Sequence, residues 1–101
     1  MISNLPDAES AERLASVLIE QRLAACVNVQ AACTSVYRWQ GKVETATEVP
    51  VWIKTTRAHY AALEAAILAH HPYELPEIIA VPVVAGLPAY LAWVATETNF
   101  R

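Results

Sequence analysis

A short polar segment in the second half of the chain holds the densest group of side chains that could do chemistry. Residues 70–77 read His-His-Pro-Tyr-Glu-Leu-Pro-Glu. Imidazole and carboxylate groups are ligands that divalent transition metals accept. The candidate metal ligands in this segment are His71 and Glu74. Alternatively, His71 and Tyr73 fix the loop by hydrogen bonds while the prolines shape its turn.

A thiol adds a third candidate ligand. Cys26 offers a soft sulfur atom, which suits Cu(I), although free cysteine is also a common small buried apolar residue. The chain has one other cysteine, Cys33, seven residues further along. On a regular strand this odd offset places the two side chains on opposite faces. A disulfide between them is therefore not expected.

Three more residues could serve a ligand cleft. Lys54 could bind an anion or close a cleft, or it could form a surface or interface ion pair. Strand alternation places Lys54 on the same side as Glu48 and Trp52. Tyr37 and Trp39 share one face of their strand, and interface packing explains them better than stacking on a ligand.

The sequence lacks the stronger catalytic and metal motifs. Its two glycines are too few for a phosphate-binding loop, and neither a CxxC pair nor an HExxH motif occurs. The spacing of Ser, His and Asp does not indicate a triad. We therefore expect a binding protein and no enzyme.

A long hairpin over residues 24–55 must position most of these side chains. Its arms run from Ala24 to Trp39 and from Val43 to Thr55, joined at Gln40-Gly41-Lys42, and apolar and polar residues roughly alternate along them. Thirteen or more residues of strand span about 45 Å, whereas the expected helices span about 24 Å. We therefore expect the hairpin to pack on another copy of the chain. Pro50, which lacks an N–H, requires a bulge or an unpaired edge.

The remaining elements follow from periodicity and capping. Residues 1–5 read as the end of a strand, and Asp7 caps a helix that reaches about residue 21 or 22. Thr56 caps a second helix that reaches about residue 70. Residues 78–84 read as a strand covered on both faces, and Pro88 begins a short third helix. This order predicts an α+β, ferredoxin-like (split βαβ) fold, with an antiparallel sheet and helices on one face. One domain spans residues 1–101.

Composition narrows the function classes. A hydrophobic content of 55% in 101 residues favours self-association, because small domains bury a smaller share of their surface. The net charge of −3 without any basic run argues against nucleic-acid binding. No apolar run approaches the ~20 residues of a membrane span, and no signal peptide precedes the first helix. We expect an intracellular protein without membrane partners.

Several segments together carry a family resemblance. They are LAACVN at 23–28, SVYRWQGK at 35–42, IKT at 53–55, HPYELPEII at 71–79 and YLAW at 90–93. By the order and spacing of these segments, the chain resembles the CutA family of divalent-cation tolerance proteins. The first strand is shorter than is usual in that family, so the native start could lie upstream of Met1. Ser3 stands at a position that can be cysteine in the family, which leaves Cys26 as the matching thiol.

The resemblance implies a cytoplasmic homotrimer whose long hairpins reach neighbouring subunits, with a role in tolerance of divalent metals, notably copper. Metal binding would use His71, Cys26 and Glu74, with Cu(II) as the expected ion. CutA proteins also resemble PII signalling proteins, which bind small molecules between subunits, so the alternative function is a sensor for an anionic small molecule. By this likeness the cleft positions are Tyr37, Trp39, Lys54, His71, Tyr73, Glu74 and Glu77.

Overall fold

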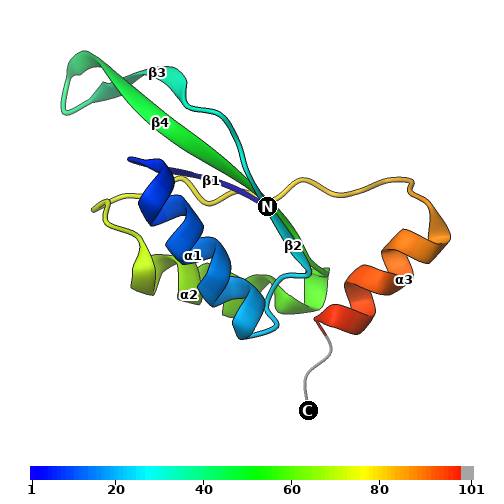
Figure 1. Ribbon diagram of the computed structural model, residues 1–101. Coiled ribbons are helices and arrows are strands. Elements are labelled where there is room, and N and C mark those ends of the chain that lie inside the picture. The colour runs from blue at the N-terminus through cyan, green and yellow to red at the C-terminus, as the bar shows by residue number, and fades with distance from the viewer. Residues whose placement is uncertain (99–101) are drawn as a thin grey trace.

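The computed structural model describes residues 1–98, in which one four-stranded antiparallel sheet carries two helices on one face (Figure 1). The elements are β1 (Ile2–Leu5), α1 (Ala8–Glu20), β2 (Cys26–Val29), β3 (Cys33–Trp39), β4 (Lys42–Lys54), a 3-10 turn (Arg57–His59), α2 (Tyr60–His70) and α3 (Pro88–Glu97). The expected α+β class is confirmed, and so is the order strand, helix, hairpin, helix up to α2, although the incoming arm of the hairpin is divided into β2 and β3.

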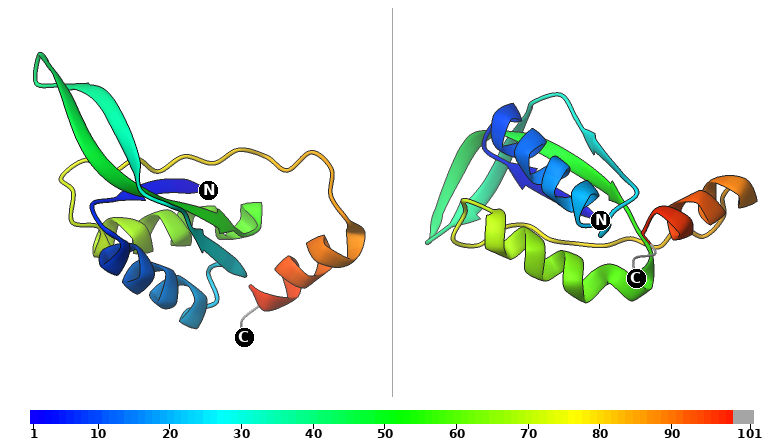
Figure 2. Two further views of the ribbon diagram at one scale, coloured as in Figure 1. Left: turned by 45° about the horizontal axis from the view of Figure 1, so that its top comes forward. Right: turned by 60° about the horizontal axis from the view of Figure 1, so that its bottom comes forward.

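Strand β4 organises the sheet. Its C-terminal half lies between β1 and β2, and its N-terminal half pairs with β3 alone. The paired β3 and β4 project beyond α1 and α2 as an arm (Figures 1 and 2). At ~3.3 Å per residue the 13 residues of β4 span about 43 Å, against ~20 Å for the 13 residues of α1. The expected overhang is therefore present.

A two-residue turn closes the arm. Gln40 and Gly41 both have positive φ, 51° and 81°. This pair of left-handed residues is typical of the type I′ turn, whose twist matches the right-handed twist of paired strands. The turn fixes the register in which Trp39 faces Lys42.

The incoming arm is not the single strand that the sequence predicted. Residues 30–32 interrupt it, and the interruption shifts the register by one residue. Cys26 faces Lys54 and Cys33 faces Glu48, so seven residues on one side oppose six on the other. An extra residue on one strand is a β-bulge. It reverses the alternation, so the two cysteines lie on the same face of the sheet and the predicted opposite faces are wrong. Both thiols are free, as expected.

Pro50 lies where β4 changes partners. Its carbonyl accepts a hydrogen bond from the Gln30 N–H at 2.9 Å, immediately beyond the last β2 pair, Val29 with Val51. The missing N–H of Pro50 therefore falls where the ladder is already broken. The sequence required a bulge or an unpaired edge at this proline, and the structure has the bulge, which lies in the facing strand at residues 30–32.

The core lies between the sheet and the two helices. Alternate residues of β4, Val49, Val51 and Ile53, point into it, and the side chains that meet them come mainly from α1 and α2. The fully buried members from the helices are Ala11, Leu18, Leu63 and Ile67. The opposite face of the sheet bears Trp52, 51% exposed, and no helix of residues 1–98 covers it.

Helix α1 begins as predicted, whereas α2 begins later. The Asp7 carboxylate accepts a hydrogen bond from the Ser10 N–H at 2.7 Å, the usual N-cap contact. Thr56 instead meets the ring of His59 at 2.6 Å and makes no such cap, so residues 57–59 form a 3-10 turn before α2 begins at Tyr60.

Residues 78–84 are not the covered strand that the sequence predicted. Only Ile79 pairs, with Ile2, in a single antiparallel bridge. Val81, Val83 and Val84 are 64%, 72% and 92% exposed. Strand β1 has only four residues to offer as a partner, and Pro82 cannot donate a hydrogen bond. Ile78 packs against the core, but one copy of the chain leaves the rest of this apolar segment uncovered.

Helix α3 begins at Pro88 as predicted but stands apart from the body (Figure 1). Of its expected packing residues only Val94 is buried, while Tyr90, Leu91 and Trp93 each keep about 40% of their surface exposed. An ion pair of 3.8 Å between Arg22 and Glu97 ties its end to the turn after α1. In residues 1–98 we find no helix with the length and apolar character that a membrane crossing requires.

Candidate functional site

His71 fastens the loop after α2 to the sheet. Its Nε2 lies 2.7 Å from the Asn4 carbonyl oxygen, and its Nδ1 accepts from the Tyr73 N–H at 3.1 Å. A carbonyl can only accept and an N–H can only donate, so the ring is neutral with its proton on Nε2. Burial lowers the pKa of His71, against the opposing effects of the Asn4 carbonyl and the Glu48 charge. Both ring nitrogens are therefore occupied within the chain.

Tyr73 and Glu48 form the polar contact beside this ring. The centres of the His71 and Tyr73 rings lie 4.8 Å apart. Burial raises the pKa of Tyr73 to about 12, helped by its hydrogen bond to the Glu48 carboxylate and by the charge of that group. Tyr37 and Asp7 add smaller effects in the same direction. The phenol is thus held as a hydrogen-bond donor.

The two carboxylates of the loop differ, because one is hydrogen-bonded to β1 and the other is exposed. Glu77 accepts from the Asn4 side-chain amide at 3.0 Å, which makes a second tie between this loop and β1. Glu74 is exposed. The loop is therefore held at His71 and Glu77, and Glu74 points to solvent between these ties.

Cys26 and Lys54 pair across β2 and β4 at the other end of the sheet. The Lys54 ammonium donates to the Asn28 side-chain carbonyl. The Cys26 sulfur lies 3.9 Å from the same oxygen atom. This oxygen takes one of the three donors of Lys54, so two remain for another ligand.

The bulge at residues 30–32 brings most of the predicted cleft residues onto one face. Tyr37 faces Glu44 and Trp39 faces Lys42. Even-numbered residues of β4 also include Glu48 and Lys54, so all these side chains and Cys26 lie on the face without helices. The predicted shared side of Glu48, Trp52 and Lys54 is confirmed.

The predicted metal ligands do not come together in one copy. His71 lies beside Glu48, whereas Cys26 faces Lys54, about 20 Å along β4 from Glu48. Within residues 1–98, no three or more His, Cys, Asp or Glu side chains are grouped as a metal ion would require. One copy therefore lacks a donor set that fits a tightly held metal.

Glu48 is the site residue that sequence reasoning did not select. Only 9% of its surface is exposed, although it lies in a strand whose neighbours Thr47 and Thr45 are exposed. Its burial comes from the loop at Tyr73, which returns from a distant part of the sequence. The alternation that placed Glu48 beside Lys54 was the available signal, but it did not indicate that this carboxylate was covered.

The comparisons with known proteins agree on one family. The model of the CutA1 divalent ion tolerance proteins matches residues 1–97. A divalent-cation tolerance protein CutA from Thermus thermophilus is 41% identical over 98% of this chain and 96% of its own length. A chloroplastic CutA 1 protein from Oryza sativa is 42% identical over 94% of this chain, which spans only 54% of that relative.

Solved structures give the same result. CutA from Xylella fastidiosa superposes with a TM-score of 0.94 at 49% identity, covering 97% of this chain and 94% of that one. A CutA from Archaeoglobus fulgidus, described as periplasmic, has 37% identity and a TM-score of 0.94, with 97% and 95% covered. A Nostoc protein described as PII-like CutA has 37% identity and a TM-score of 0.89, with 97% and 94% covered. The chain belongs to the CutA1 family of divalent ion tolerance proteins and has the ferredoxin-like fold predicted for it.

Proposed function

We propose that this chain is one subunit of a homotrimer that binds a divalent metal ion, Cu(II) foremost, and contributes to tolerance of such ions without turning over a substrate. The proposed assembly rests mainly on the apolar surface that one copy of the chain leaves exposed. It comprises the sheet face around Trp52 and the segment with Val81, Val83 and Val84. Large exposed apolar patches mark interaction sites on protein surfaces.

The metal part of the proposal rests on the family and on the donor residues. The relatives are named for tolerance of divalent cations, and none of the names reported above states a reaction. The candidate ligands remain His71, Cys26 and Glu74, and His71 would exchange its hydrogen bond from the Tyr73 N–H for the ion. Because one copy groups no three donors within residues 1–98, we propose that the ion takes ligands from more than one subunit. Copper stands highest in the general affinity order for nitrogen and sulfur ligands.

Calorimetric titration of the reduced, metal-free protein with Cu(II), Zn(II) and Mn(II), together with native mass spectrometry, tests this function. We expect a trimer that binds copper at a fixed ratio per trimer, and weaker binding at low pH as ligands protonate. His71→Ala should weaken Cu(II) binding and leave the trimer intact, with His70→Ala as the neighbouring control. A trimer with only weak, unsaturable metal binding would contradict the metal function.

The second candidate function is a PII-like sensor for an anionic small molecule. The Lys54 ammonium, which keeps two donors for a ligand, favours it. Tyr37 and Trp39 lie on the same face but about 33 and 40 Å along β4 from Lys54, so they would reach its ligand only from another subunit. Tyr73 and Glu77 would support this cleft from the loop. Under this function Lys54→Ala abolishes thermal stabilisation by the bound metabolite and leaves metal binding unchanged. If no compound of a metabolite panel raises the melting temperature of the wild-type protein, this candidate fails.

The cytoplasmic location stays a prediction from the sequence. The rice relative is named chloroplastic and the Archaeoglobus protein periplasmic, so the family occurs in more than one compartment. Fractionation of cells that express the full-length gene product would test the prediction.

A further inference from the structure

We propose that Asn4 is a positioning residue for the candidate site, because it ties both ends of the loop at residues 71–77 to strand β1. This inference rests on the proposed function, in which His71 and Glu74 of that loop are ligands of the ion. Asn4 is not itself a proposed ligand. It acts through the loop, with its backbone carbonyl at one end and its side chain at the other.

The first tie lies on the edge of β1 that faces away from β4. Ile2 exchanges two backbone hydrogen bonds with Ile79 on this edge, at 2.9 and 3.2 Å. Alternate residues of an antiparallel strand direct their backbone groups to the same edge, so the Asn4 carbonyl points there as well. The His71 Nε2 lies 2.7 Å from this carbonyl oxygen. The imidazole therefore takes the place of the N–H that a paired strand would offer to Asn4.

The second tie is made by the Asn4 side chain. Its Nδ2 donates to the Glu77 carboxylate at 3.0 Å, at the far end of the loop. A hydrogen bond to a carboxylate is stronger than one between two neutral groups. Between the ties stand Pro72 and Pro76, whose fixed φ angles leave the loop few alternative conformations. One residue of β1 therefore determines where the whole loop lies.

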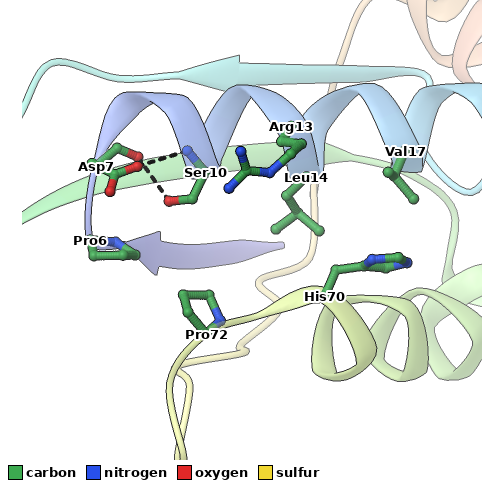
Figure 3. A pocket seen from close by; sticks show the side chains of 8 residues that line it. All are labelled: Pro6, Asp7, Ser10, Arg13, Leu14, Val17, His70 and Pro72. Carbon is green, nitrogen blue, oxygen red and sulfur yellow. Dashed lines mark hydrogen bonds between the residues drawn. The ribbon is translucent and has the colours of Figure 1, made fainter.

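Packing on the helical side holds the loop only in part. The beginning of the loop borders a hollow of about 360 Å³ between α1 and the end of α2. Figure 3 shows Pro72 at the edge of this hollow, across from Pro6 at the start of α1. A hollow offers no atoms for close contact, so dispersion attraction on this side is incomplete. The hydrogen bonds to Asn4 must therefore supply much of the positioning.

The ties position the contact between Tyr73 and Glu48. The Tyr73 N–H donates to His71 Nδ1 at 3.1 Å, and its hydroxyl is hydrogen-bonded to the Glu48 carboxylate. Glu48 is 9% exposed because this loop covers it. A released loop would have to be ordered again by any ligand that binds it, and this entropy cost weakens binding. Removing the Asn4 side chain should therefore weaken ligand binding at a site that it does not touch.

Amide hydrogen exchange of the metal-free protein tests the ties without any ligand. The Tyr73 N–H is the reporter, because its acceptor is the His71 ring. In Asn4→Ala we expect this N–H to exchange about fivefold faster, the effect of losing one hydrogen bond. The amides of the buried Leu18 in α1 and Leu63 in α2 should keep their wild-type exchange rates. Equal acceleration of all three amides would mean that Asn4 stabilises the fold as a whole, and would overturn the positioning role.

Matched changes at the carboxylates identify the hydrogen bond. Glu77→Gln should accelerate exchange of the Tyr73 N–H, because an amide oxygen is the weaker acceptor, whereas Glu74→Gln at the exposed carboxylate should not. Asn4→Asp should accelerate it most, since two carboxylates then meet. Combining Asn4→Asp with Glu77→Gln exchanges donor and acceptor and should restore the wild-type rate. A double variant as fast as Asn4→Asp alone would overturn the role of this bond and with it the proposal.

Calorimetric titration of the same variants with Cu(II) connects the loop with the proposed function. We expect Asn4→Ala to bind Cu(II) about threefold more weakly than the wild type, and the double variant to recover the wild-type affinity. If the wild type binds no Cu(II), the metal function fails, and the exchange rates alone decide whether Asn4 holds the loop. If Asn4→Ala speeds loop exchange yet keeps the wild-type affinity, Asn4 does not position the ligands and the proposal is overturned.

Discussion

At the scale of single residues, His71 holds two parts of the chain together through one ring. The sequence identified His71, Tyr73 and Glu77 as important because polar groups gather there. Their hydrogen bonds to β1 could not be predicted, since Asn4 lies 67 residues away in sequence from His71. Glu48 was missed for the same reason, because its cover comes from a distant loop. The alternative in which His71 and Tyr73 fix the loop by hydrogen bonds is therefore the one that agrees with the contacts in the structure.

The neutral state of His71 has a consequence for stability. Its folded pKa lies below the ordinary value of 6.5, so the unfolded chain takes up the proton first. The contribution is fully present above pH 6.5 and is lost as pH falls through the folded pKa. We expect the free energy of unfolding, measured with urea at fixed protein concentration, to decrease from pH 7 to pH 5. His71→Gln should flatten this decrease, and His70→Gln should not. Equal slopes in all three proteins would exclude the role assigned to His71.

Tyr73 gives a second prediction, at the opposite end of the pH scale. Its pKa is raised from 10.0 to about 12, so its contribution is present below pH 10 and is lost as pH rises through 12. Between these values the unfolding free energy of the wild-type protein should fall more steeply than that of Tyr73→Phe. Tyr90→Phe is a useful control, because Tyr90 lies in α3 and its ring packs against Trp93 of the same helix. If Tyr73→Phe keeps the wild-type slope, the contact with Glu48 contributes nothing to stability.

At the scale of elements, the sequence predicted where helices begin better than it predicted which strands pair. Asp7 gave the start of α1 and Pro88 the start of α3, because caps act on neighbouring residues. The bulge at residues 30–32 had no such signal, since the segment Gln-Ala-Ala contains neither glycine nor proline. Residues 78–84 were predicted as a covered strand from their apolar character. An apolar segment needs another apolar surface to cover it, and one copy of the chain does not supply that surface.

The cap of α1 can be tested directly. Asp7→Ala removes the acceptor for the Ser10 N–H and should lower the free energy of unfolding, because the first turn of α1 loses its cap contact. Glu9→Ala, a change to another acidic residue of the first turn, should cost less, because Glu9 makes only an exposed ion pair. Chemical denaturation of the two variants at the same pH gives the comparison. Equal losses would show that charge near the helix start, and not the cap contact, is what matters.

At the scale of the whole molecule, the projecting arm dominates the shape. The longest dimension of the described chain is 44 Å, and the helices cover only part of it. Comparing strand and helix lengths predicted this overhang without any knowledge of pairing. Which surface of a second copy would meet the arm could not be predicted, because the sequence does not give the arrangement of subunits.

Trp39 is the residue through which the arm is expected to contribute to assembly. Trp39→Ala should weaken the proposed trimer, because a large aromatic group near the hairpin tip contributes much of the area that a contact there could bury. Arg38→Ala, on the opposite face of the same strand, should have a smaller effect. Native mass spectrometry over a dilution series measures the fraction of trimer for each protein. A Trp39→Ala trimer that resists dilution as well as the wild type would exclude this role for the arm.

The bulge at residues 30–32 also determines how this part of the gene can change in length. The two-residue turn fixes how β3 pairs with β4, so one residue fewer at 30–32 would give six residues against six and would leave Cys33, Tyr37 and Trp39 on their present face. The interruption therefore separates the register of β2 from that of β3. Insertions and deletions of a single residue should be tolerated at 30–32, whereas one residue lost within β3 would turn the side chains on one side of the loss to the other face.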